Sequence, residues 1–300
     1  MTGVPVRTEV LMGTLVTIHV VRPGTDDAIE RAFGWFREIE ARCSRFDQQS
    51  ELVQLTSQVG APVPASPILF EGVRFALAVA EDTDGAFDPT IGHHMEARGF
   101  NREDRTGRAV RTPISPDGDV SYRDVRVDPE RQTITLRRPL LLDLGAVAKG
   151  LAVDAAAREL QPFKDFAIDA GGDLYFGGRN PAGAPWSVGI RHPRIDGQLI
   201  DVLRVSDKAV CTSGDYERTV TGVDREHHIV NPRTGASPTG VASVTVVAPG
   251  AMVADALATA AFVLGPADGI TLLERHGVDG LIVTDALERS ETSGLRLGRA

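Results

Sequence analysis

The chain has 300 residues, of which 42% are hydrophobic and 24% charged, proportions that are ordinary for a globular protein. Its formal net charge of −9 argues against general nucleic-acid binding and against adhesion to anionic membranes, because both require a basic surface. Two cysteines, Cys43 and Cys211, are too few for a disulfide framework, and neither has a neighbour at metal-ligand spacing.

The N-terminal half predicts strands and helices in alternation. Its first residues show no signal peptide, lipobox cysteine or membrane-spanning segment, which predicts a cytoplasmic protein. β-Branched residues predict a strand over 13–21, and apolar residues at helical spacing predict helices over 26–42 and 66–85. A polar stretch rich in proline and glycine, 102–124, predicts a long loop, and 125–138 predicts a hairpin.

The C-terminal half predicts a helix that begins near Gly145 or Ala146, followed by two short strands around Gly171 and Gly172. Strands 186–193, 199–205 and 209–214 are predicted to continue one sheet. They are followed by a strand over 241–249, an apolar helix over 252–265, a helix near Leu272 and a strand over 280–285. Because many strands are hairpin-like, the pattern favours an α+β fold over a doubly wound parallel sheet. There is no internal repeat and no phosphate-binding P-loop.

The start of the helix near Gly145 carries an unexpected pair of residues. Lys149 lies in its first turn, where the helix dipole disfavours a cation, and Gly150 follows, a residue unfavourable inside a helix. One interpretation is an anion site, in which backbone N–H groups and the lysine bind phosphate and the glycine lets the ligand approach. The alternative is a surface lysine paired with Asp154 or Glu159.

The helix over 252–265 is apolar nearly all round, so it is predicted to be buried. Asp255 and Thr259 interrupt it at positions i and i+4 and therefore share one face. A buried carboxylate is costly unless it is paired or bound to a cation, and oxygen ligands suit magnesium. The alternative is that Asp255 bonds to a neighbouring strand and Thr259 to its own helix.

Other polar residues cluster along the chain. Asp88, which precedes Pro89, is a candidate site residue or the acceptor of an Asx turn. Two polar segments, 211–220 and 227–238, are predicted to be neighbouring loops of a site. They contain Ser213, Asp215, Tyr216, Arg218, His228 and Arg233. The pair His93 and His94 is not assigned to the site, because paired histidines are more often structural or exposed.

Seven motifs occur in a definite order: "MGT" at 12–14, "FDPT" at 87–90, "LDLGAVAKG" at 142–150, "DAGGDLYFGG" at 169–178, "TSGDYER" at 212–218, "HIVNPRTG" at 228–235 and "ADALATAAFVLG" at 254–265. This order resembles the ApbE family, the FAD:protein FMN transferases, over almost the whole chain. The resemblance implies one α+β domain over 1–300, related to the T-fold. Its two lobes would have mixed or antiparallel sheets and packed helices, with a cleft for FAD between them.

The resemblance also implies a magnesium-dependent enzyme that moves FMN from FAD onto a threonine or serine hydroxyl of an acceptor flavoprotein and releases AMP. The implied metal ligands are Asp255, Thr259 and the backbone carbonyl of Ala146. The implied FAD contacts are Met12, Phe46, Ala86, Phe87, Asp88, Asp143, Lys149, His228 and Ile229. The anion near Lys149 would then be the FAD pyrophosphate.

The chain departs from the family pattern at several positions. Phe46 stands where many relatives carry tyrosine, Thr56 where asparagine is usual, and Met252 where some relatives have a second acid. The secretion leader common among relatives is absent. The first three departures bear on the affinity of the site and on the number of metal ions that it binds, rather than on the reaction. The last bears on whether the protein works in the periplasm.

The residue types suit phosphoryl transfer, which depends on charge neutralisation and an aligned nucleophile. The positive charge of Lys149 would stabilise the phosphates, and a base, either His228 or Asp215, would take the acceptor's proton. Two alternatives remain open. The first is a FAD pyrophosphatase, in which water replaces the protein hydroxyl, and the second is a flavin-binding module without turnover.

Overall fold

A computed structural model describes residues 5–102, 107–112, 114, 119–217 and 227–297. Its centre is an eight-stranded sheet in the order β1-β2-β6-β7-β10-β11-β12-β13, and all neighbouring strands are antiparallel. The strands are β1 (Val6–Leu11), β2 (Thr14–Val20), β6 (Phe166–Ala170), β7 (Asp173–Gly177), β10 (Lys208–Gly214), β11 (Val241–Ala248), β12 (Asp279–Thr284) and β13 (Arg289–Glu291).

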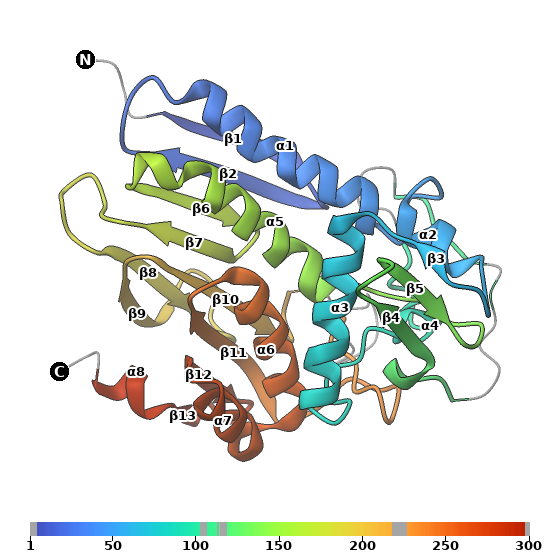
Figure 1. Cartoon of the computed structure of the whole chain (residues 1–300). Helices are drawn as coiled ribbons and strands as arrows, with labels where there is room; N and C mark the ends of the chain where they lie inside the picture. Colours follow the sequence, from blue (N-terminus) through green and yellow to red (C-terminus); the bar gives the residue numbers. More distant parts are fainter. Residues whose placement is uncertain (1–4, 103–106, 113, 115–118, 218–226, 298–300) are drawn as a thin grey trace.

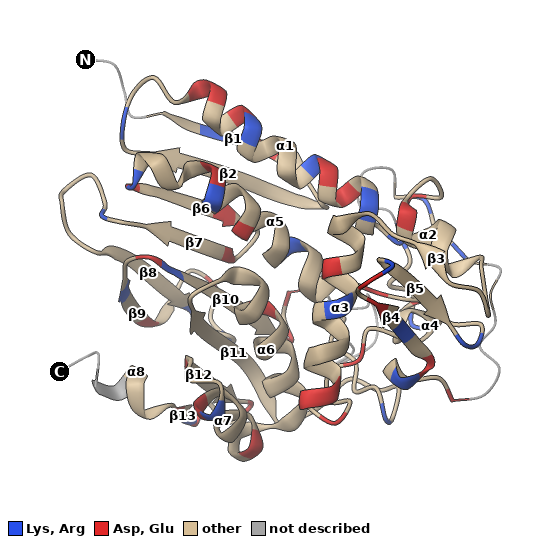
Figure 2. Ribbon diagram, in the orientation of Figure 1, with Lys and Arg blue, Asp and Glu red and all other residues tan. Residues whose placement is uncertain are grey.

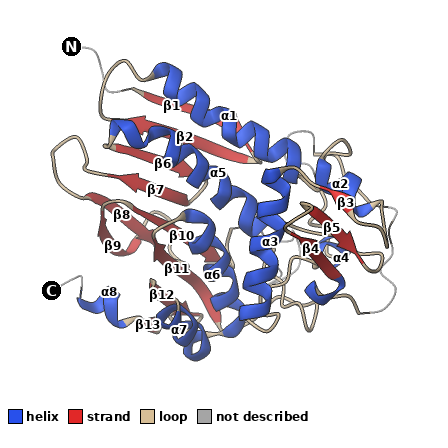
Figure 3. Cartoon of the chain, in the orientation of Figure 1, coloured by secondary structure: helices blue, strands red, loops and turns tan. Residues whose placement is uncertain are grey.

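One face of this sheet is covered by a row of helices, as Figures 1 and 3 show. These are α1 (Asp26–Cys43), α5 (Gly145–Leu160), α6 (Ala251–Leu264) and α7 (Pro266–Arg275). The helices lie side by side because apolar stripes such as Ile29, Phe33 and Phe36 of α1 face the sheet and exclude water. Figure 2 shows acidic and basic residues interspersed along α1.

The opposite face carries a separate hairpin, β8 (Trp186–Arg191) and β9 (Leu199–Val205). The prediction that these strands continue one sheet with β10 is therefore wrong. Alternate residues of β8, Trp186, Val188 and Ile190, pack onto a second apolar cluster together with Val210 and Val247 of the main sheet. The alternation in β8 predicts a half-buried strand, but it does not specify which sheet edge or face the strand joins.

The second lobe lies beside one end of the main sheet (Figure 1). It contains a small sheet in the order β3-β5-β4 and the long helix α3, which contacts α1, α5 and α6. Its elements are α2 (Glu51–Thr56), β3 (Val63–Pro64), α3 (Pro67–Asp82), α4 (Gly92–Ala97), the 3-10 turn η1 (Tyr122–Asp124), β4 (Val125–Asp128) and β5 (Thr133–Leu136). The remaining elements are the 3-10 turn η2 (Gln161–Phe163) and α8 (Ser293–Leu297).

Tight turns set the register within two hairpins of the main sheet, β1–β2 and β6–β7. Gly171 and Gly172 have φ of +64° and +98° and join β6 to β7, so the two-strand prediction around them is confirmed. Met12 and Gly13, with φ of +51° and +72°, make the equivalent turn between β1 and β2. β1 itself was not predicted. The α+β expectation is confirmed by these antiparallel sheets and the helices packed on them.

Among the described residues, no helix is both long and apolar enough to cross a membrane.

Candidate active site

Lys149 lies near the start of α5, as predicted, in the first regular turn after the non-helical Ala146, and its partner is Asp173, the first residue of β7. Its Nζ forms an ion pair with Asp173 Oδ2, and the side chains of Lys149 and Asp173 are 25% and 4% exposed. Burial acts to lower the pKa of Lys149, but the charges of Asp173 and then Asp255 outweigh burial and raise it. Lys149 is therefore a charged lysine whose buried partner fixes its direction.

The alternative of a surface lysine paired with Asp154 or Glu159 is wrong. Asp154 accepts hydrogen bonds from the backbone of α6, and Glu159 pairs with Arg31 at 2.5 Å. Gly150 also differs from its interpretation as a place for ligand approach. A Cβ at Gly150 would lie 2.5 Å from the Cα of Met252, so the glycine allows α5 to contact α6.

Asp255 is buried in α6, as predicted, and is 7% exposed. Its Oδ2 has no hydrogen-bond partner among the described residues. Burial and then the charge of Asp173 raise its pKa to about 7, while Lys149 acts in the opposite direction. An unpartnered buried carboxylate oxygen close to a second carboxylate is the feature expected of a cation site.

The atoms around Asp255 fit a hard cation that prefers oxygen ligands. Thr259 Oγ1 lies 3.3 Å from Ser213 Oγ of β10, so two hydroxyls meet one turn along α6 from Asp255. Ala146 departs from helical geometry, with φ of −90° and ψ of +17°, which turns its carbonyl away from the ideal helical direction. The described residues contain no group of three or more His, Cys, Asp or Glu side chains that could hold a metal. A magnesium ion here would thus need hydroxyl, carbonyl and water oxygens besides the carboxylate of Asp255.

Asp143 and Phe46 are joined by a residue that was not predicted, Arg45. Arg45 is 7% exposed, and its Nε lies 2.6 Å from Asp143 Oδ2. Its guanidinium stacks over the Phe46 ring at 4.2 Å and donates to the carbonyl of Phe100. The other carboxylate oxygen of Asp143 accepts from the N–H of Gly145 at 2.7 Å, so the carboxylate also orients the start of α5.

The run Ala86, Phe87 and Asp88 is buried. Asp88 Oδ1 accepts from the N–H and hydroxyl of Thr90 at 2.8 and 2.7 Å, and Oδ2 accepts from the N–H of Tyr122 at 2.9 Å. Burial nonetheless raises the pKa of Asp88. The Asx-turn alternative is thus present in the structure, and the carboxylate shapes the backbone of this run.

The two candidate bases have different surroundings. Both oxygens of Asp215 accept from Arg194, each at 2.7 Å, and this bidentate pair holds the end of β10 near the 192–198 turn. His228 is half-buried and precedes the buried Ile229. Arg218 lies outside the described residues, and Arg233 donates to Asp84, next to the 86–88 run.

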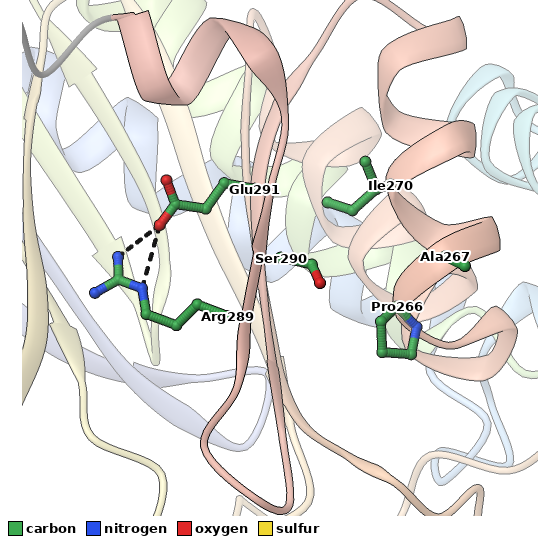
Figure 4. Close-up of a pocket in the computed structure, with 6 residues that line it drawn as sticks. All are labelled: Pro266, Ala267, Ile270, Arg289, Ser290 and Glu291. Carbon is green, nitrogen blue, oxygen red and sulfur yellow. Dashed lines mark hydrogen bonds and ion pairs between the residues drawn. The ribbon is translucent and has the colours of Figure 1, made fainter.

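Two hollows on the surface lie apart from this group of residues. One, of about 440 Å³, lies between α7 and β13 and is lined by Pro266, Ala267, Ile270, Arg289, Ser290 and Glu291 (Figure 4). Another, of about 260 Å³, lies among α1, α3 and α5. Neither contains Lys149, Asp173 or Asp255. The assignment of the site therefore rests on buried charge rather than on the size of a hollow.

Two residues of this region were missed by the sequence analysis, Asp173 and Arg45. Asp173 follows two glycines and opens a strand, so its position next to a turn was visible, but its pairing with Lys149 depends on folding. Arg45 stands at the end of a helix where an exposed arginine is ordinary. Its neighbour Phe46 was the only signal.

Comparisons with known sequences identify the family of this chain. The profile of the ApbE family matches residues 12–282. A FAD:protein FMN transferase from Treponema pallidum is 35% identical, over 92% of this chain and 83% of the relative. One from Vibrio cholerae is 30% identical, over 91% of this chain and 85% of the relative.

Solved structures agree in fold. The crystal structure of an ApbE protein from Thermotoga maritima superposes with a TM-score of 0.88 at 30% identity, covering 99% of this chain and 100% of that one. The flavin transferase ApbE from Vibrio cholerae superposes with a TM-score of 0.85 at 26% identity, covering 98% and 99%. With its sequence matched over most of its length and its fold reproduced almost completely, this chain belongs to the ApbE family.

Proposed function

We propose that the chain is a FAD:protein FMN transferase that requires magnesium and modifies a threonine or serine of an acceptor flavoprotein. The observation that carries the proposal is the buried carboxylate of Asp255. Its Oδ2 has no hydrogen-bond partner among the described residues, and the charges of Asp173 and Lys149 both shift its pKa. The names of the relatives supply the reaction class, FMN transfer from FAD to a protein.

The proposed metal ligands are Asp255, Thr259 and the carbonyl of Ala146. Magnesium bound there would neutralise negative charge on the phosphates of FAD. The unpartnered Oδ2 of Asp255 and the non-helical geometry of Ala146 support this assignment. Asp173 adds negative charge close by and is proposed to hold Lys149 in place rather than to bind the phosphates itself.

Lys149 is proposed to contact the pyrophosphate or a nearby flavin oxygen. Its ammonium has three donors, of which the ion pair with Asp173 need occupy only one. A quarter of its side chain is exposed, so a ligand can reach it. The remaining proposed FAD contacts are Met12, Phe46, Ala86, Phe87, Asp88, Asp143, His228 and Ile229. For Asp88, the hydrogen bonds to Thr90 and Tyr122 favour contact through the backbone of 86–88.

In the proposed reaction, the acceptor hydroxyl oxygen attacks the phosphorus on the FMN side of FAD. A new O–P bond forms, the pyrophosphate O–P bond breaks, and AMP leaves with the bridging oxygen. The hydroxyl proton passes to a base. We favour His228 over Asp215, because both oxygens of Asp215 are already occupied by Arg194. No covalent enzyme intermediate is required.

The decisive experiment mixes the full chain, magnesium and FAD with a flavoprotein fragment that carries a target threonine. Mass spectrometry is expected to show a gain of one FMN minus water on that threonine, with one AMP released for each label. The same fragment with the threonine replaced by valine is the control and should remain unlabelled. FMN supplied without FAD should give no label, because it has no AMP leaving group.

Release of equal FMN and AMP into solution, with no acceptor labelled, would favour the pyrophosphatase. Binding of FAD without release of AMP under any of these conditions would favour the non-catalytic flavin-binding module. Labelling from FMN alone would contradict the proposed mechanism.

A further inference from the structure

Asp154 accepts two backbone hydrogen bonds from the first turn of α6. Its Oδ1 lies 2.6 Å from the N–H nitrogen of Ala251, and its Oδ2 lies 3.0 Å from that of Met252. The residue that precedes α6, Gly250, has no side chain to cap the helix. A carboxylate from α5 therefore caps α6 from outside, where N–H groups and the helix dipole favour negative charge.

The contact between α5 and α6, here called the seam, is formed by Gly150 and Asp154 of α5 with Ala251 and Met252 of α6. It also brings the two helix backbones together. Gly150 lies one turn before Asp154 and so shares its face of α5. A Cβ at Gly150 would fall 2.5–2.7 Å from backbone atoms of Met252 and Ala251. From β10, Cys211 Sγ lies 3.6 Å from the carbonyl oxygen of Ala251. The first turn of α6 is thus fixed by a carboxylate, a glycine contact and a strand residue.

This seam lies between the charged groups of the candidate site. Lys149 is next to Gly150 on α5, and Asp255 is one turn after Ala251 on α6. The Asp173 and Asp255 carboxylates carry like charges, which repel each other. The fold must therefore hold α6 against this repulsion. Burial raises the pKa of Asp154, while its two backbone donors favour the charged form.

We propose that Asp154 is a positioning residue of the metal site, which sets where the Asp255 carboxylate lies relative to Ala146 and Lys149 by fixing the first turn of α6. The inference rests on the proposed magnesium site and adds a residue that touches neither metal nor substrate. Residues that hydrogen-bond directly to metal ligands typically change metal affinity about 10–100-fold when they are mutated. Asp154 acts one step further away, through the backbone of α6.

The test measures magnesium binding directly, without turnover. Isothermal titration of the full chain with Mg²⁺ compares the wild type with Asp154→Asn, at a temperature where circular dichroism shows both folded. Asparagine keeps the size of the side chain but has one acceptor oxygen in place of two, so one N–H of α6 loses its partner. We expect the dissociation constant for Mg²⁺ to rise about tenfold or more.

A second variant keeps Asp154 and moves it slightly. Gly250→Ala would place a methyl group 3.0 Å from Asp154 Oδ2, and the φ of −141° at this residue suits alanine. We expect a smaller loss of Mg²⁺ affinity in the same direction. The control is Asp128→Asn, which makes the same substitution at a carboxylate that accepts two backbone N–H groups, those of Glu130 and Arg131, both at Oδ1, but in the β4–β5 turn.

The outcomes separate this inference from the proposed function. One outcome is that wild type binds Mg²⁺, Asp255→Ala abolishes binding, and Asp154→Asn and Gly250→Ala both bind Mg²⁺ as wild type does. Asp154 then has a structural role only, and this inference is wrong while the proposed metal site stands. A lower melting temperature with unchanged Mg²⁺ affinity has the same meaning. If wild type does not bind Mg²⁺, the metal site and this inference both fall.

Discussion

Lys149, Asp173 and Asp255 form a largely buried group with one positive and two negative side chains. A buried ion pair contributes little net stability, because the charges lose their hydration, and a second carboxylate adds repulsion. The arrangement is therefore costly in the absence of a ligand. Such a cost is retained where charge is needed for binding or catalysis, which supports the proposed site.

Asp173→Asn tests the role of the residue that the sequence analysis missed. The substitution removes the main charge partner of Lys149, so burial would then favour the neutral amine. A hydrogen bond to a charged group contributes about 1.5–3 kcal/mol, so we expect kcat/KM for FMN transfer to fall about tenfold or more. Steady-state assays at saturating magnesium measure the change.

Asp169→Asn is the matched control for that variant. Asp169 lies on the same hairpin and is exposed, and among the described residues it accepts only from the N–H of Gly172, at 3.0 Å. It should retain nearly full activity. Wild-type FAD affinity and turnover in Asp173→Asn would contradict the assigned role of the Lys149–Asp173 pair.

Between elements, the end of α3 is joined to the end of α7 by Asp82. Its Oδ2 lies 2.7 Å from Arg275 Nη2 and 2.7 Å from His276 Nε2, and Arg275 also donates to the carbonyl of Asp82. Burial acts to raise the pKa of Asp82, but His276 and Arg275 outweigh it and lower the pKa below its usual 3.8. Asp82, through Arg275 and His276, thus links the second lobe to the helices that cover the main sheet.

Asp82→Asn is expected to reduce stability at neutral pH but not in strong acid. Because the folded-state pKa is below the unfolded value, the contribution is present above about pH 4 and lost as the pH falls through the folded-state pKa. For a pair exposed to this degree, the loss should be on the order of 1 kcal/mol or less. Urea unfolding of both proteins across this pH range measures it, and an equal difference at every pH would exclude the ion pair as its cause.

At the scale of helices and strands, the sequence predicts most of the elements but not which elements pack or pair with one another. The helices over α1, α3 and α6 were predictable because their apolar residues repeat with helical spacing. The position of β8–β9 was not, because alternation in Trp186–Arg191 specifies a buried side and not the sheet it joins. In the site, the Asp255–Thr259 face was visible within one helix, whereas Asp154, Asp173 and Arg45 act on residues distant in sequence.

For the molecule as a whole, one apolar cluster crosses both lobes. It joins Val16 and Ile18 of the main sheet and Phe33 of α1 to Leu69 of α3 and Leu136 of the small sheet. A shared core of this kind favours cooperative unfolding, which supports the prediction of one domain over 1–300.

Differential scanning calorimetry should therefore show a single transition, with the calorimetric enthalpy equal to the van't Hoff enthalpy. Magnesium is expected to raise the melting temperature, since a ligand that binds only the folded state stabilises it. Two resolved transitions would show that the lobes unfold independently and would contradict the single-domain prediction.

The order of the main sheet also determines when it can be completed. β2 pairs with β6, so Val16 lies opposite Ala170, and the whole second lobe and α5 are made in the interval. Pairing between such distant segments requires the closure of a long loop before any contact compensates for it, which slows folding. During synthesis the edge of β2 that will pair with β6 therefore remains unpaired until β6 leaves the ribosome. Premature association through that edge is the hazard this topology carries.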